Sequence, residues 1–202
     1  FNEESPTQNN KGIKVTAKAA NANHIVQWKS GIFSYPSGVA TYTISLFVKD
    51  DTAGYVYLSI NAGSPNISIS KVIDLSDGSI TRSFDDTGED EIIVKEAGNG
   101  WYRISIVHTT DGDAGAQPSF LVGPHNGSNN PNYFASGTES IYIFGAQFEA
   151  GSFPTSYIKT TGATATRSAD VASIPVADFG YNVKAGALVV DFNTPNALND
   201  DR

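Results

Sequence analysis

The sequence has no cysteine, few basic residues and no long hydrophobic run. Without cysteine the chain forms no disulfide and has no thiol chemistry, so its fold depends on packing alone. Thirteen basic residues against 21 acidic ones give a formal net charge of −8, which disfavours nucleic acid and anionic membrane surfaces as partners. No apolar stretch is long enough to insert into a bilayer. A neutral partner such as a polysaccharide remains compatible with this charge.

The composition favours an all-β protein rich in turns. The chain has 202 residues, of which 40% are hydrophobic, enough for one domain of good size with a core. It also has 19 glycines and nine prolines, and it is rich in serine, threonine and asparagine. Such residues at this apolar content are typical of short strands joined by turns.

Alternation of apolar and polar residues, with Phe47 as the exception, predicts two long strands near the middle of the chain. In residues 39–49 the apolar side chains Tyr42, Ile44, Leu46 and Val48 share one parity, as expected of a half-buried strand. Residues 54–61 repeat the pattern. Because the segment between them is short, polar and ends in glycine, we expect the two strands to form an antiparallel hairpin.

Further strands follow at a spacing that is typical of a β-sandwich or jelly roll. We therefore predict an all-β antiparallel β-sandwich of the jelly-roll type over residues 1–160 and an extended linker over 161–180. Residues 181–202 then form an extra strand or the truncated start of a following β-sandwich domain. The other expected strands are residues 13–19, 24–35, 68–75, 91–97, 101–109, 118–123 and 140–150.

The parity opposite the expected core carries the candidate binding site. Aromatic rings next to amide, carboxylate and guanidinium groups suit sugar recognition, because a pyranose stacks on a ring while its hydroxyls take hydrogen bonds. An alternative is an ordinary solvated sheet face, where tyrosine, threonine and lysine are common. The candidate sugar-binding residues are Lys49, Tyr55, Tyr57, Trp101, Arg103, Gln147 and Glu149.

The aromatic stretch 140–160 divides into a strand and a turn. In the strand, the even parity that holds Tyr142, Phe144 and Phe148 is expected to face the core, and Gln147 and Glu149 the opposite side. After the strand, we expect Phe153, Tyr157 and Ile158 to pin the departing chain back onto the sandwich.

Metal binding and catalysis have weaker signals. The acidic runs 85–91 and 111–115 offer oxygen ligands that a calcium ion could use, but they lack EF-hand spacing, and solvated loops are the better explanation. No two of His24, His108 and His125 have metal-ligand spacing. We therefore expect no cofactor.

Among catalytic residues, Glu149 is a conceivable glycosidase carboxylate without an identifiable partner. The absence of known catalytic motifs predicts a protein that is not an enzyme. A polysaccharide-degrading module stays a weaker alternative.

Three motifs resemble a known domain family. They are YTISLFVK at 42–49, GNGWYRISI at 98–106 and IYIFGAQFEAGSFPTSYIKTTGATATRSAD at 141–170. Together they resemble the carbohydrate-binding-module-like jelly-roll domain of bacteriophage tail fibre and other virion structural proteins, over roughly residues 20–170. The matching positions include Lys49 in the first motif, Trp101, Tyr102 and Arg103 in the second, and Gly145, Ala146, Gln147 and Glu149 in the third. Phe148 stands where leucine is commoner, and YNVKAGALVVDF at 181–192 resembles the first strand of a concanavalin-like sandwich.

The resemblance implies two functions that differ physically. The first is a non-catalytic virion module that binds a host cell-surface glycan through the aromatic and polar sheet face or through loops. The second is a structural spacer or assembly module of the fibre that binds no sugar. Either would contact other virion subunits, and homotrimers are expected of fibre proteins. A binder should present an exposed aromatic platform, whereas a spacer should bury Trp101, Tyr55 and Tyr57.

Overall fold

The computed structural model describes residues 5–6, 12–28, 38–63, 66–84, 91–110 and 119–166, and the single residues 168, 173, 175 and 184. The chain divides into two units, Phe1–Gly162 and Ala163–Arg202. All the strands described below belong to the first unit. The predicted linker 161–180 and the predicted strand within 181–202 lie largely outside the described residues.

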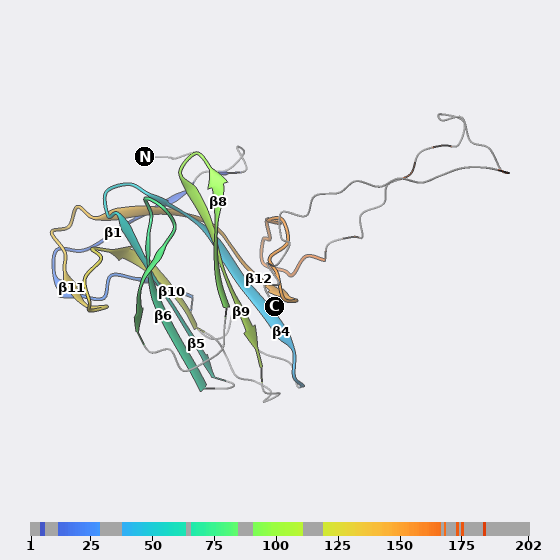
Figure 1. The fold of residues 1–202 in the computed structure, drawn as a ribbon, viewed down its shortest axis with the longest axis horizontal. Coiled ribbons are helices and arrows are strands. Elements are labelled where there is room, and N and C mark those ends of the chain that lie inside the picture. Colours follow the sequence, from blue (N-terminus) through green and yellow to red (C-terminus); the bar gives the residue numbers. More distant parts are fainter. Residues whose placement is uncertain are drawn as a thin grey trace. The chain divides into compact units, whose positions relative to one another are not determined.

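The first unit is built from two five-stranded antiparallel sheets, with a small two-stranded sheet beside them (Figure 1). This confirms the prediction of an all-β antiparallel β-sandwich, and the jelly-roll connectivity stays a prediction. In the part of the chain that the structure describes, no helix is long and apolar enough to cross a membrane. The first sheet, in spatial order, consists of β1 (Ile13–Thr16), β12 (Ser140–Ala150), β4 (Thr41–Asp50), β9 (Trp101–Thr109) and β8 (Glu91–Gly98). The second consists of β3 (Val26–Trp28), β10 (Ser119–His125), β5 (Tyr55–Gly63), β6 (Asn66–Asp74) and β7 (Ile80–Phe84), and the small sheet pairs β2 (Asn21–Ala22) with β11 (Tyr133–Phe134).

The core lies between the two large sheets and is made by one parity of each central strand. In β4 this parity is Ile44, Leu46 and Val48, and in β5 it includes Val56 and Leu58, all of them nearly or fully buried. The predicted parity of both strands is thus confirmed. Full burial of one such side chain contributes about 1.5–3 kcal/mol, so these strands supply much of the stability of the sandwich.

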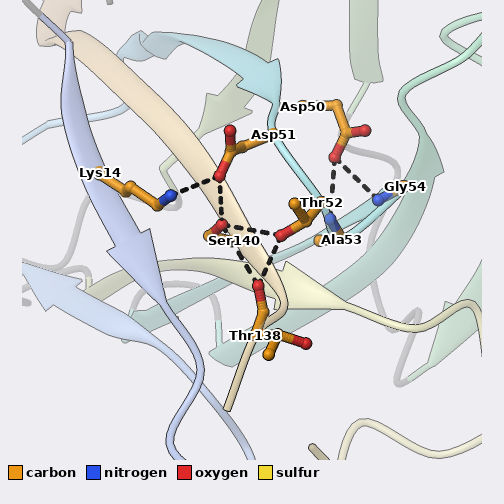
Figure 2. Close-up of polar contacts among 8 residues, drawn as sticks. All are labelled: Lys14, Asp50, Asp51, Thr52, Ala53, Gly54, Thr138 and Ser140. Carbon is orange, nitrogen blue, oxygen red and sulfur yellow. Dashed lines mark hydrogen bonds and ion pairs between the residues drawn. The ribbon is translucent and has the colours of Figure 1, made fainter. Parts of the chain in front are cut away.

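The expected hairpin between residues 39–49 and 54–61 is wrong. Strand β4 pairs with β12 and β9, whereas β5 pairs with β10 and β6. The connection therefore crosses from one sheet to the other. Within it, the Asp50 carboxylate accepts hydrogen bonds from the backbone N–H groups of Ala53 (3.1 Å) and Gly54 (2.8 Å) (Figure 2). Two strands that face each other across a core alternate in the same way as two paired strands, so the pattern does not distinguish them.

This crossing is fastened to the start of β12. The carbonyl oxygen of Ser140 accepts hydrogen bonds from the N–H groups of Asp51, Thr52 and Ala53. The Ser140 hydroxyl donates to Asp51 Oδ2 (2.6 Å), which also pairs with Lys14 Nζ of β1 (2.5 Å). Hydrogen bonds from Lys14 and Ser140 lower the pKa of the Asp51 carboxyl. The hydrogen bond to Asp51 in turn raises the pKa of Lys14. Three segments far apart in the sequence therefore meet at one end of the first sheet.

A β-bulge in β12 corrects the predicted faces of that strand. The register with β4 shifts between Phe144 and Gln147, and Gly145 has φ of 62°, in the left-handed region that such a bulge favours. Before the bulge, Tyr142 and Phe144 pair with Lys49 and Phe47 of the outer parity, so these two aromatic residues do not face the main core as predicted. After it, Phe148 packs against the core, as predicted.

Candidate functional site

Five of the seven candidate residues lie on the outer face of the first sheet, the face turned away from the core. The register pairs Lys49 with Trp101 and places Arg103 opposite Phe47. It also pairs Gln147 with Ser45 and Glu149 with Thr43. Directly paired residues share one face of a sheet, so the prediction that these five residues lie off the core side is confirmed by the register.

The aromatic residues of this outer face form a second small core. Trp101, Phe47 and Tyr142 are buried, and Ala97, Phe144 and Tyr157 pack against them. The Trp101 side chain is only 1% exposed. A methyl group at Gly12 would lie 2.8 Å from Cη2 of Trp101, which shows how closely the backbone of that residue covers the ring. Trp101 is therefore a packing residue and presents no open aromatic platform.

Gln147 and Glu149 hold the segment that follows β12, residues 151–158, which we call the exit segment. Gln147 Oε1 accepts a hydrogen bond from the N–H of Ile158 (3.0 Å). Glu149 accepts from the N–H of Thr155 (3.1 Å) and from its hydroxyl. All three hydrogen bonds are made in the second half of the exit segment, at Thr155 and Ile158. Gln147 and Glu149, which were both predicted to contact a sugar, therefore bind the protein's own chain.

Packing of the exit segment begins at the bulge. The ring of Tyr157 meets that of Phe144 edge to face at 4.9 Å between centroids. A methyl group at Gly145 would lie 3.1 Å from Tyr157 Cδ2 and 3.3 Å from Phe47 Cδ2, so only glycine fits there without displacement. The prediction that Tyr157 pins the departing chain is confirmed. The same expectation for Phe153 is wrong, because its side chain is 58% exposed.

Arg103 is the most unusual charged group of this face. Its guanidinium donates from Nη2 to Ser45 Oγ (3.0 Å) and lies 5.2 Å from the centre of the Phe47 ring. Burial lowers the pKa of Arg103, while the charge of Glu149 acts in the opposite direction; the group nevertheless stays protonated at neutral pH. The Nε atom of Arg103 and the Nε2 atom of Gln147 are buried without a hydrogen-bond partner among the described residues.

Tyr55 and Tyr57 are separated from the other five candidates, because they lie on the outer face of the second sheet. Tyr57 is 5% exposed. Its hydroxyl donates to Ser70 Oγ (3.0 Å), and its ring stacks near His125 at 6.1 Å. Tyr55 is half-buried, and a methyl group at Gly127 would lie 2.8 Å from its ring. The seven predicted residues therefore form no single site.

A group of buried rings at β10 and β11 was missed as a unit by the sequence analysis. Tyr133 meets His24 edge to face at 4.8 Å and His125 at 5.0 Å, and its hydroxyl donates to the carbonyl oxygen of Pro124 (2.9 Å). Burial, with a smaller effect of the charge of Glu139, raises the pKa of Tyr133 to about 12. His125 Nδ1 accepts from the N–H of Gly127 (3.0 Å), so its Nε2 donates to the carbonyl oxygen of Asn130 (3.0 Å). Both histidines therefore act in packing.

Next to this group one aromatic side chain points outward. Phe134, the neighbour of Tyr133 in β11, is 73% exposed. It pairs with Asn21 of β2, which is also exposed. The sequence does show an aromatic residue here, within the asparagine-rich stretch 126–134. A strand of two residues has no alternation, however, from which the outward direction of Phe134 could have been predicted.

The two acidic runs proposed for calcium lie almost wholly outside the described residues. Within the described ranges, no group of three or more histidine, aspartate and glutamate side chains is arranged to hold a metal ion. Glu149, the conceivable catalytic carboxylate, is bound to Thr155 of the exit segment. No family model matches this chain, and no match is found among curated proteins.

Proposed function

We propose that this chain is a non-catalytic structural module of a bacteriophage tail fibre or related virion protein, in which the sandwich holds the exit segment in a fixed orientation. The support for a virion protein is the resemblance of the three motifs at 42–49, 98–106 and 141–170. The support for a structural role is the use of the outer face of the first sheet. The module works as a rigid spacer that sets the direction in which the chain leaves the sandwich.

The observation that carries the proposal is the docking of the exit segment by Gln147 and Glu149. A glycan bound at these side chains would first have to break three hydrogen bonds to Thr155 and Ile158. Each of these bonds contributes about 0.5–1.5 kcal/mol. Their sum approaches the binding free energy of roughly 4 kcal/mol that corresponds to a millimolar Kd. Burial of Trp101 removes the stacking surface as well. The outer face therefore favours a spacer over the glycan-binding alternative at this place.

Spin-label distances test this role directly. The chain has no native cysteine, so a double variant with Lys159→Cys and Thr109→Cys can be labelled at two exposed positions. For the pair at Lys159 and Thr109 we expect a narrow distance distribution, no wider than that of a control pair labelled at Lys18 and Thr109. Adding Gln147→Ala and Glu149→Ala should broaden only the pair that includes Lys159. A broad distribution for Lys159 in the otherwise native chain would contradict the spacer role.

A tail-fibre module is expected to assemble as a homotrimer, and other fibre subunits are its proposed partners. Sedimentation equilibrium of the chain, whose mass is 21.4 kDa, measures this. Three chains per particle support the proposal, whereas a monomer at all concentrations contradicts the trimer.

A further inference from the structure

We infer that the outer face of the first sheet binds a chloride ion between the guanidinium of Arg103 and the side-chain amide of Gln147. The ion would accept hydrogen bonds from Arg103 Nε and Gln147 Nε2. Docking of the exit segment uses a different atom of Gln147, its Oε1. The anion site therefore goes beyond the spacer role, and either can fail without the other.

The two donor atoms are buried and unused. Neither Arg103 Nε nor Gln147 Nε2 makes a hydrogen bond within the part of the chain that the structure describes. The rest of each side chain is already fixed, because Gln147 Oε1 accepts from the N–H of Ile158 (3.0 Å) and Arg103 Nη2 donates to Ser45 Oγ (3.0 Å). Turning the Gln147 amide over would put an NH₂ group against the N–H of Ile158. A buried donor loses its hydration without compensation, so both atoms require an acceptor.

The two donors come together at Ser45 of β4. Gln147 pairs directly with Ser45 across β12 and β4, where paired side chains lie about 4.5–5.5 Å apart at Cβ. Arg103 lies on the other side of β4, opposite Phe47 in β9, and its guanidinium reaches back to the Ser45 hydroxyl. Ser45 is 0% exposed, so a ligand bound beside it is shielded from water.

The charge of Arg103 lacks an adjacent carboxylate. Its direct neighbours on the two adjoining strands are Phe47 in β4 and Lys95 in β8, an aromatic ring and a second cation. The charge of Glu149 does act on Arg103, but its carboxylate is bound at Thr155, and the described chain has no ion pair between Glu149 and Arg103. A partly buried cation in this position is stabilised by an anion that contacts it directly.

The chemistry of the donors favours an anion over a water molecule. A water molecule that accepted both bonds would also need acceptors for its own hydrogens, yet the buried side-chain atoms left without a partner in the described residues are both donors. An anion accepts only, and its hydrogen bond to a guanidinium is charge-assisted. Sulfate and phosphate need more room and more donors than these two atoms supply, so chloride is the expected ion. The net charge of −8 opposes anion binding, so we expect a Kd in the millimolar range.

Urea unfolding of the whole chain in two sodium salts tests the inference. Chloride is compared with gluconate, an anion too large for the site, at the same ionic strength so that screening is equal. For a Kd of about 10 mM, about 100 mM chloride should lower the unfolding equilibrium constant about tenfold relative to gluconate. The chloride NMR signal should also broaden when the protein is added. Equal stability in the two salts overturns the anion site. If the Thr155 and Ile158 amides are still protected from exchange, the spacer role stands without it.

Variants locate the ion. Gln147→Glu keeps an oxygen for the N–H of Ile158 and places a second oxygen where the amide nitrogen stood, so Arg103 Nε gains a protein acceptor. This variant should be more stable than the native chain in gluconate and should lose the response to chloride.

Arg103→Met removes the cation and should also lose the response. Arg82→Met is the matched control, because Arg82 is an exposed arginine in β7 of the other sheet; its chloride response should equal that of the native chain. A native-like response in Gln147→Glu or Arg103→Met overturns the site, and so does loss of the response in Arg82→Met.

Discussion

Gly145→Ala should loosen the exit segment and destabilise the sandwich more than the same change at a glycine with open space around it. Gly145 has φ of 62° and Gly54 has φ of 74°, so an alanine at either position occupies the left-handed region at a cost of about 1–2 kcal/mol. Around Gly54 no atom lies within 4 Å of the added methyl group, whereas at Gly145 the rings of Tyr157 and Phe47 lie at 3.1 and 3.3 Å. Gly54→Ala therefore measures the backbone contribution alone.

The additional cost at Gly145 is that of overpacking, about 1–3 kcal/mol. For a chain of this length 1 kcal/mol corresponds to a shift in Tm of about 2–4 °C. We expect Gly54→Ala to lower Tm by a few degrees and Gly145→Ala to lower it by roughly twice as much or more, measured by circular dichroism and checked by urea unfolding. Equal shifts in the two variants would refute the close contact between the bulge and Tyr157. Greater stability of Gly145→Ala would refute the left-handed requirement.

Four further outcomes are expected. Trp101→Ala should cost about 3–5 kcal/mol in urea unfolding, because it empties a buried site; a stability close to that of the native chain would contradict the burial of this ring. Burial lowers the pKa of His125 below 6.5, so the unfolded chain takes up the proton first and stability should fall as the pH drops from 6.5 toward the lower folded pKa. His125→Gln should flatten that part of a pH series of urea midpoints, and an unchanged slope would exclude His125 as the cause. Because Lys14 and Ser140 lower the pKa of Asp51 below 3.8, the stability that this carboxylate contributes is complete above that pH and is lost as the pH falls through the folded pKa. Asp51→Asn should weaken this acid dependence in the same series, and a full acid dependence in that variant would argue against the Lys14 contact in solution. Sedimentation equilibrium should give a trimer for the native chain, and a monomer at all concentrations would contradict the proposed assembly.

Alternation predicted the strands better than their partners. The core parity of β4 and β5 was correct, because period-two patterns follow directly from burial on one face. The pairing of these strands with each other was wrong, since burial says which side of a strand faces the core and nothing about its neighbours. The crossing is specified instead by Asp50 and by the carbonyl oxygen of Ser140, which lies about 90 residues away in the chain and has no local signal.

The error in β12 comes from one residue. A glycine inside a strand often marks a bulge, and at Gly145 the bulge reverses the parity, so the same strand has Phe144 on the outer face and Phe148 in the core. The outward placement of Gln147 and Glu149 could be predicted from alternation. Their hydrogen bonds to the exit segment could not, because these depend on how the chain folds back after Gly151.

Native-state hydrogen exchange of the Thr155 and Ile158 amides tests the central claim most directly. If the exit segment is docked on the outer face by Glu149 and Gln147, both amides should exchange far more slowly than an unprotected amide, and Gln147→Ala with Glu149→Ala should abolish that protection while β4 and β9 stay protected. Exchange of Thr155 and Ile158 at the unprotected rate in the native chain would contradict the account, since the outer face would then be open and its polar side chains available to a ligand.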